Sequence, residues 1–212
     1  MVRSIDKTLR RQELAEAVWR IILREGLDAA SVRNVASEAN LSAGSVRHFF
    51  SSQAELHVFA MEALSDRVAS RIAQAATIDD LRTRIMAMLA ELLPVTDRSE
   101  SEFRIWMQFV LRAQFDVRLE LVAKATIDAV RDLLLHVVAS QRELGLISEH
   151  TDIEDTAIEL NALIDGLMFE RLAAPHMISR EQTMAVLARW LDSRYLGGPH
   201  ATEEHDPTVS SV

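Results

Sequence analysis

The sequence contains no cysteine, which excludes disulfide bridges and thiolate chemistry. Long apolar runs are missing too, because no stretch reaches about 18 uninterrupted apolar residues, the length that spans a bilayer. The charged amino-terminal segment lacks the apolar core of a signal peptide. We therefore expect a cytoplasmic protein without a membrane segment.

Motifs of catalysis and metal binding are absent from the sequence as well. It contains no phosphate-binding loop, nucleophile elbow or zinc-ligand cluster. His150 and Glu154 have the i, i+4 spacing of a ligand pair, but they straddle the start of a predicted helix. The polar tail holds a second group: His200, Glu203, Glu204 and His205. Neither group predicts a fixed site, so we expect no metal, no cofactor and no enzyme activity.

The net charge of −9 is distributed unevenly along the chain. Residues 1–57 hold eight Lys or Arg and seven Asp or Glu, whereas the remainder holds fifteen basic and twenty-five acidic residues. Four of the early positive charges fall in the first eleven residues: Arg3, Lys7, Arg10 and Arg11. An acidic second part repels nucleic acid and helps to orient the other end toward it.

Helical periodicity and capping residues divide the chain into nine predicted helices. Proline is scarce, and all four prolines lie outside these helices. No alternating strand pattern competes with them, so we predict an all-α fold. The helices are expected from about Asp6 to Glu25, as two short helices between Ser31 and Phe50, from a Ser52/Glu55 capping box to about Ala75, from Thr77 to Pro94, from a Ser99/Glu102 box to about Gln114, from about Asp116 to Leu144, from a Thr151/Glu154 box to Pro175, and from a Ser179/Gln182 box to Gly197.

Residues 31–56, SVRNVASEANLSAGSVRHFFSSQAEL, have the spacing of a DNA-binding helix-turn-helix. Ser31 is suited to cap the first short helix, and Asn40 is suited to the left-handed conformation that ends it. Ser42 is suited to cap the second short helix. The positions expected to face inward are Val32, Val35, Ala36 and Ala39 in the first helix and Leu41, Val46 and Phe50 around the second.

The outward positions of the second short helix are small or hydrogen-bonding. Small side chains permit close approach to a major groove, and the polar ones can contact base edges. Gly44 costs about 1 kcal/mol relative to alanine in a helix, and close passage of a phosphate backbone is one reason to keep it. The alternative for Arg33 and Arg47 is a solvated helix face. The outward set is Ser42, Ala43, Gly44, Ser45, Arg47 and His48.

This layout resembles the TetR family of bacterial transcriptional repressors. The run LSAGSVRHFFSSQAEL is similar to that family's recognition helix and its entry into the following helix. The residues Arg47, His48, Phe49 and Phe50 look most like the BetI-like branch. The chain departs from many members by having Arg47 in place of tyrosine and Gln53 in place of lysine. The lost lysine weakens any phosphate contact at position 53.

The resemblance implies an amino-terminal helix-turn-helix three-helix DNA-binding domain over residues 1–50. It also implies a six-helix ligand-binding and dimerisation domain over residues 51–198, and residues 199–212 are expected to form a disordered tail. In such a protein a homodimer binds a palindromic operator in double-stranded DNA and is released by a small-molecule effector. A rival hypothesis is a helical adaptor that binds proteins and does not use DNA.

The resemblance assigns DNA contact to residues around both short helices. Ser31 and Arg33, with the flexible Arg10 and Arg11, would position phosphates, and Ser45, Arg47 and His48 would read bases. Trp19, Phe49 and Phe59 are expected to pack in the core or hinge. The complete predicted set is Ser31, Arg33, Ser42, Ala43, Gly44, Ser45, Arg47 and His48.

The helix expected after Thr151 is apolar on two faces, although a single core needs only one. One stripe contains Ile153, Ala157, Leu160, Ile164 and Leu167, and the other contains Ile158, Ala162, Gly166, Phe169 and Ala173. The small residues of the second stripe suit close packing against a partner helix, and the alternative is a helix central in the monomer. The predicted dimer interface is Ile158, Ala162, Gly166, Phe169, Val186 and Trp190.

The segment from residue 103 to residue 115 holds four of the eleven aromatic residues. Such a segment could line a pocket for an apolar or cationic ligand, although an aromatic stripe at helical spacing also fits a plain core. Arg104, Gln108 and Arg112 form a polar stripe that is expected to face solvent. The predicted ligand contacts are Phe103, Trp106, Met107, Phe109, Val110 and Phe169.

Overall fold

The computed structural model describes residues 2–196, with side chains from residue 9 onward, and the predicted tail 199–212 lies outside them. Over this range the chain forms nine α-helices, one 3-10 turn and no strand, which confirms the predicted all-α fold. By packing, the chain divides into two units, Met1–Val130 and Arg131–Val212, with the boundary inside one long helix. The functional division at residue 50 stays a prediction.

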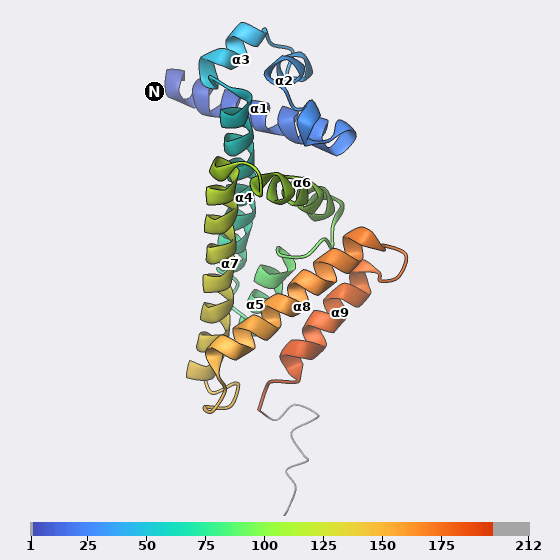
Figure 1. Cartoon of the computed structure of the whole chain (residues 1–212). Helices are drawn as coiled ribbons and strands as arrows, with labels where there is room; N and C mark the ends of the chain where they lie inside the picture. Colours follow the sequence, from blue (N-terminus) through green and yellow to red (C-terminus); the bar gives the residue numbers. More distant parts are fainter. Residues whose placement is uncertain (1, 197–212) are drawn as a thin grey trace, which may run out of the picture. The chain divides into compact units, whose positions relative to one another are not determined.

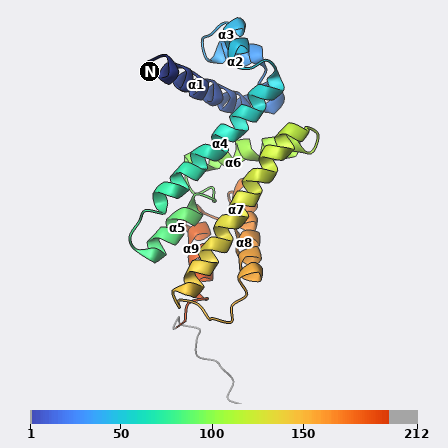
Figure 2. The same cartoon turned by 90° about the vertical axis from the view of Figure 1, so that its left-hand side faces the viewer.

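The first unit contains six helices and the first half of a seventh. The pair α2 and α3 packs together and against α1, and α4 leads from this group to α5 and α6 (Figure 1 and Figure 2). The elements are α1 (Val2–Glu25), the 3-10 turn η1 (Leu27–Ala29), α2 (Val32–Glu38), α3 (Ala43–Phe49), α4 (Gln53–Ala75), α5 (Leu81–Ala90), α6 (Asp97–Ala113) and α7 (Val117–Glu143).

One hydrophobic cluster joins the short helices to the longer ones. Burying a large apolar side chain contributes about 1.5–3 kcal/mol, so this cluster is the main attachment of α2 and α3 to the unit. The contributing side chains come from every surrounding helix and include Leu14 and Ile22 of α1, Val35 of α2, Val46 of α3, Leu56 and Met61 of α4, Ile105 and Phe109 of α6 and Leu119 of α7. The two short helices therefore share a core with α6.

A network of ion pairs joins α4 to the end of α5 and to α6. Arg71 Nε donates to Glu91 Oε2 at 2.7 Å, and Arg71 Nη2 donates to Glu102 Oε2 at 2.6 Å. The side chains of Arg71 and Glu102 are 13% and 8% exposed, so water screens their attraction weakly. Burial alone would lower the pKa of Arg71, but the hydrogen bonds with both carboxylates outweigh it and raise that pKa.

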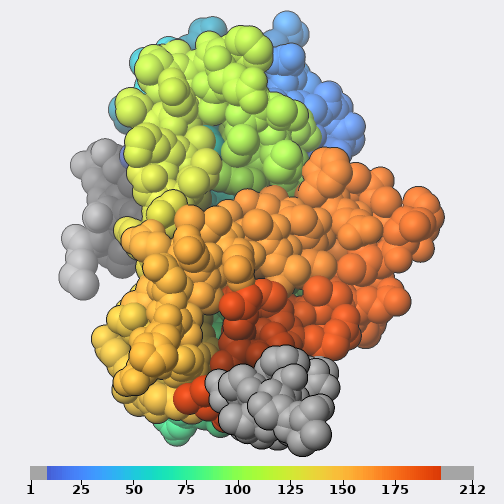
Figure 3. Space-filling model, turned by 60° about the horizontal axis from the view of Figure 1, so that its bottom comes forward, coloured from blue at the N-terminus to red at the C-terminus, as the bar shows by residue number. Residues whose placement is uncertain are grey.

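The second unit contains the rest of α7 together with α8 (Ile153–Ala173) and α9 (Arg180–Asp192). Helices α8 and α9 lie side by side (Figure 1), and their side chains form adjoining orange and red surfaces in Figure 3. The stripe of α8 predicted to face the interior is buried at Ala157, Leu160, Ile164 and Leu167. None of the described helices is long and apolar enough to cross a membrane.

The starts of α5 and α6 differ from the prediction. Asp80, and not Thr77, caps α5 by accepting a hydrogen bond from Thr83 N. Thr96 caps α6 and forms a reciprocal capping box with Ser99, so the predicted Ser99/Glu102 box is wrong. Ser99 occupies the third helical position, and the carboxylate of Glu102 is used by the ion pair with α4.

Three other helix ends were partly mispredicted. Asp152 caps α8 in place of Thr151. Helix α9 ends at Asp192 and does not continue to Gly197, although its predicted Ser179/Gln182 box is present. Ser52 caps α4 as predicted, but Glu55 accepts hydrogen bonds from Ser51 N and Oγ, and the Ser52/Glu55 box is therefore incomplete.

Candidate nucleic-acid interface

The two short helices begin and end where the sequence predicts. The Ser31 side chain accepts a hydrogen bond from Asn34 N, and the Ser42 side chain accepts one from Ser45 N at 3.0 Å. Asn40 has a φ of 55° and so ends α2 in the left-handed conformation. These local contacts fix the turn between α2 and α3 and thereby the direction of α3.

The inward positions of the motif are buried as predicted. Val35 and Val46 are fully buried, and so is Phe50 at the end of α3. Leu41 in the turn is half-buried and packs against the same cluster. Because this face is held by the core, the opposite face of α3 is presented to solvent.

The outward face of α3 borders an open depression of about 700 Å³. Ser42, Gly44, Ser45, Arg47 and His48 are exposed, and Ala43 is half-buried. The depression has both hydrogen-bonding and apolar lining residues, which are Arg10, Leu41, Ser42, Gly44, Ser45, His48 and Phe49. Leu41 and Phe49 were not among the predicted contacts, since their apolar character indicated packing only.

Two arginines of the motif are free for an external partner. Arg33 and Arg47 are exposed, and neither forms an ion pair with another residue that the structure describes. Arg10 and Arg11, which were expected to be flexible, lie on α1. The Arg10 Nη1 contacts Glu13 at 2.7 Å, and the Arg11 guanidinium lies 4.4 Å from the ring centroid of Phe59.

Internal packing does not require the glycine at position 44. A Cβ atom built at Gly44 would lie 3.7 Å from Ser42 Oγ, an ordinary van der Waals distance, and the backbone φ is not positive. Alanine would therefore fit the free protein and favour the helix by about 1 kcal/mol. Any need for glycine here comes from outside the chain.

Side chains from α4 and α6 hold Gly26–Ala30, the segment that leads from α1 into α2 and that we call the entry segment. The Nε2–H of His57 donates to Ala30 O at 2.8 Å. Gln108 Oε1 accepts a hydrogen bond from Leu27 N at 2.9 Å, and Gln108 Nε2 donates to Ile22 O at 3.3 Å. The prediction that Gln108 faces solvent was therefore wrong.

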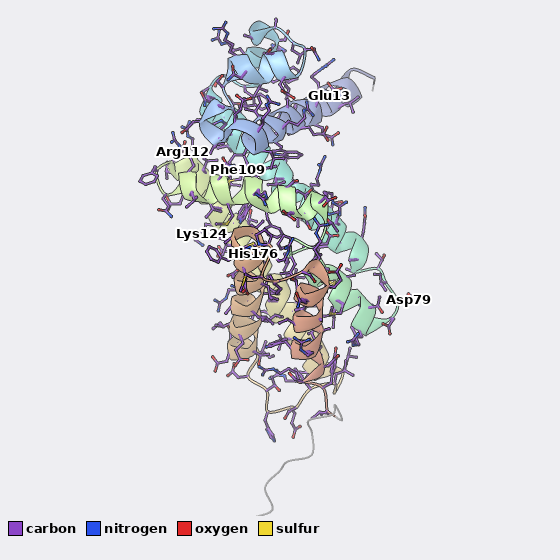
Figure 4. The ribbon with its side chains drawn as sticks, turned by 90° about the vertical axis from the view of Figure 1, so that its right-hand side faces the viewer. Glu13, Asp79, Phe109, Arg112, Lys124 and His176 are labelled. Atoms are coloured by element: carbon purple, nitrogen blue, oxygen red, sulfur yellow. The ribbon has the colours of Figure 1, made fainter. Side chains whose placement is uncertain are left out.

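Arg112, from the same polar stripe of α6, also approaches the entry segment. Its Nη1 lies 3.6 Å from Asp28 Oδ1. Figure 4 shows Phe109 and Arg112 on the side of α6 that faces the amino-terminal helices. The i, i+4 spacing of Gln108 and Arg112 gave no signal for these contacts, because the partners are backbone and side-chain atoms far away in the sequence.

The buried His57 makes the stability of this region depend on pH. Burial lowers the pKa of His57 more than the bond to Ala30 O and the charges of Asp28 and Asp116 raise it, and Arg112 lowers it further. The folded state then binds fewer protons than the unfolded state, so stability is full above about pH 6.5 and falls as the pH drops. For one proton the slope cannot exceed about 1.4 kcal/mol per pH unit.

We expect His57→Gln to flatten this dependence, because the glutamine amide can still donate to Ala30 O but does not titrate. Urea unfolding of both proteins between pH 7.5 and 5.5 measures the difference. Wild type should lose more stability than the variant over this range. Parallel losses would contradict the assigned role of His57.

The residues predicted to contact a ligand lie in different surroundings. Phe109 is fully buried in the core of the first unit, where its ring centroid lies 6.5 Å from that of His57. Phe103, Trp106, Met107 and Val110 are half-buried on α6. Phe169 belongs to the second unit and is 66% exposed.

The predicted interface stripe of α8 lies on the surface of the second unit. Ile158 is 51% exposed, and Ala162, Gly166 and Phe169 are also exposed. On α9, Val186 and Trp190 are half-buried. A Cβ atom built at Gly166 meets no atom within 4 Å, so the chain itself leaves this surface open.

The residues considered as metal ligands form no cluster in the described part of the chain. No group of three or more His, Cys, Asp or Glu side chains is suitably placed there. His150 is exposed before α8, and Glu154 pairs with Arg131 at 2.8 Å. The group His200, Glu203, Glu204 and His205 lies outside the described residues.

Two family models match the sequence. Residues 14–58 match the model described as bacterial regulatory proteins, tetR family. Residues 81–195, more than half of the chain, match the model described as BetI-type transcriptional repressor, C-terminal. The first match contains α2, the turn and α3, and the second contains α5 to α9.

Known proteins resemble the chain over nearly its full length. The HTH-type transcriptional regulator PksA of Bacillus subtilis is 31% identical over 208 residues, which cover 98% of this chain and all of PksA. A transcriptional regulator from Rhodococcus sp. Rha1 has a similar structure, with a TM-score of 0.74 and 27% identity over 87% of this chain and 95% of its own. A regulator from Saccharomonospora viridis, solved in complex with choline, has a TM-score of 0.79 and 21% identity over 89% of this chain and 98% of its own.

Proposed function

Because the chain belongs to the TetR family of bacterial transcriptional regulators, with the BetI-type repressor carboxy-terminal domain, we propose how it reads and releases DNA. A homodimer places the outward face of α3 from each protomer in the major groove of a palindromic operator. A small molecule that binds the second predicted domain releases the operator.

The observation that carries DNA reading is the outward face of α3. It combines exposed hydrogen-bonding side chains with two arginines that form no ion pair within the described chain. In this proposal Arg47, His48 and Ser45 contact base edges, and Ser31, Arg33 and Ser42 contact phosphates or sugars. Ala43 and Gly44 permit close approach, which explains a glycine that the chain does not itself need.

The exposed stripe of α8 supports the homodimer. A twofold contact uses the same surface on both protomers, so a helix with small residues can approach its own copy closely. Ile158, Ala162, Gly166 and Phe169 on α8, with Val186 and Trp190 on α9, form this proposed interface. Twofold symmetry in turn requires two related half-sites in the DNA.

The effector proposal rests on α6. Half-buried Phe103, Trp106, Met107 and Val110 supply an aromatic and methionine-rich surface, with the buried Phe109 behind it. Aromatic rings attract organic cations through their negative faces. Because the Saccharomonospora regulator was solved with choline, small quaternary amines are the first class of effector to test. Phe169, which is exposed in the second unit, suits the interface better than this ligand surface.

Selection of bound duplexes from a random pool tests the proposal directly. We expect a palindromic consensus whose half-sites are centred about 10 base pairs apart, or a multiple of that spacing. Binding of the consensus should weaken steeply with salt, with a log–log slope of about −0.9 for each phosphate contact. No enrichment, together with a flat response to salt, would favour the protein-binding adaptor and refute DNA reading.

A further inference from the structure

The second unit carries an open hollow beside the proposed dimer interface. It has a volume of about 340 Å³ and lies between the end of α8, the connector and α9. Cavities of about 150 Å³ already accept a benzene-sized ring, so this hollow has room for an aromatic side chain. Its lining residues are Glu170, Met177, Ile178, Gln182, Ala185, Val186 and Arg189.

The wall formed by the connector is held in place by a buried arginine. The Arg171 side chain is on α8, and its Nη1 donates to Pro175 O at 3.1 Å and to Ile178 O at 3.0 Å. The residue is only 5% exposed, so these contacts are shielded from water. The hollow is therefore formed before any partner arrives.

An exposed aromatic ring lies next to the hollow. Phe169 precedes the lining residue Glu170 on α8 and is 66% exposed, a large apolar surface for a side chain in water. A twofold interface needs a surface that is complementary to itself. A projecting ring and a preformed apolar hollow on the same unit meet this requirement.

The rim of the hollow is self-complementary in charge as well. Glu170 on α8 and Arg189 on α9 both line it. Neither forms an ion pair with another residue in the described part of the chain. In a twofold contact Glu170 of each protomer can face Arg189 of its partner, which favours a second copy over an uncharged apolar occupant.

We propose that the phenyl ring of Phe169 from each protomer seats in the partner's hollow and anchors the dimer. This inference rests on the proposed homodimer and adds the residue and the receptor surface that hold it. The exchange is reciprocal, so each dimer contains two such contacts.

Two single variants remove the two halves of the contact. Phe169→Ala removes the ring, and Ala185→Trp fills the hollow from an exposed position of α9. We expect each variant to raise the dimer dissociation constant by a factor of about 30 or more, the effect of losing an interface hot spot. Phe115→Ala is the matched control, because it removes another exposed phenylalanine, in the first unit. Sedimentation velocity over a dilution series measures all three.

Mixing the two variants gives the decisive result. A heterodimer of Phe169→Ala with Ala185→Trp keeps one ring in one open hollow, and its filled hollow faces no ring. We therefore expect the mixture to form a heterodimer tighter than either variant homodimer, as native mass spectrometry can resolve. Circular dichroism of each variant confirms that the protomer is folded.

The alternative outcomes are distinguishable. Variants that dimerise like wild type, or that weaken the dimer without recovery on mixing, would overturn the Phe169 contact and leave the homodimer intact. A wild-type protein that stays monomeric with and without consensus DNA would overturn the homodimer itself. An Ala185→Trp protein that keeps its dimer but no longer responds to choline would assign the hollow to a small molecule instead.

Discussion

Replacing Arg47 with alanine is expected to abolish operator selectivity. The guanidinium is exposed on α3 and forms no ion pair within the described chain, so its removal leaves no buried charge and no lost packing. A bidentate arginine–guanine contact discriminates by about 1–3 kcal/mol, and a dimer makes the contact twice. The affinity for consensus DNA should fall by roughly 30-fold to 10⁴-fold relative to wild type.

Fluorescence anisotropy with consensus and scrambled duplexes at one salt concentration measures this loss. Arg33→Ala is the informative comparison, because loss of a phosphate contact weakens binding to every sequence alike and lowers the salt slope by about one. Helicity and dimerisation should be unchanged in both variants. Selectivity that survives Arg47→Ala would remove this residue from base reading.

The largest expected loss of stability follows from replacing Arg71 with methionine. The change leaves Glu102 buried at 8% exposure without its partner and close to a second carboxylate, Glu91. Breaking a buried ion pair in this way costs about 3–5 kcal/mol. Urea unfolding at a fixed protein concentration should therefore show a large fall in the midpoint.

Arg98→Met provides the matched control. Its Nη2 lies 3.7 Å from Glu91, and its side chain is 54% exposed, so the pair should contribute less than about 1 kcal/mol. Adding Glu102→Leu to Arg71→Met should recover much of the lost stability, because the unpaired buried carboxylate is then gone. Equal effects of Arg71→Met and Arg98→Met would show that the network is not a buried one.

The parts of the fold that the sequence predicted are those determined by near neighbours. Ser31 and Ser42 cap their helices through atoms three residues away, and Asn40 takes its left-handed conformation locally. The predicted outward face of α3 follows from the same register. Its assignment to bases and phosphates stays a prediction, because those contacts are made outside the chain.

The errors arose where two local solutions were available and a distant partner decided between them. Thr96 and Ser99 both suit a helix start, and the pairing of Glu102 with Arg71 of α4 agrees with the earlier one. Similarly, a polar residue at position 108 fits an exposed stripe until the backbone of Leu27 is brought beside it. Neither partner can be found from periodicity.

The grip of Gln108 on the entry segment gives the protein a thermodynamic reciprocity. An effector that displaces α6 does work on the backbone of Leu27, immediately ahead of the DNA-reading helices. Linkage then requires that the operator weaken effector binding by the same factor by which the effector weakens operator binding. Occupied operators are therefore the least sensitive sensors in the cell, and protein free of DNA captures the effector first.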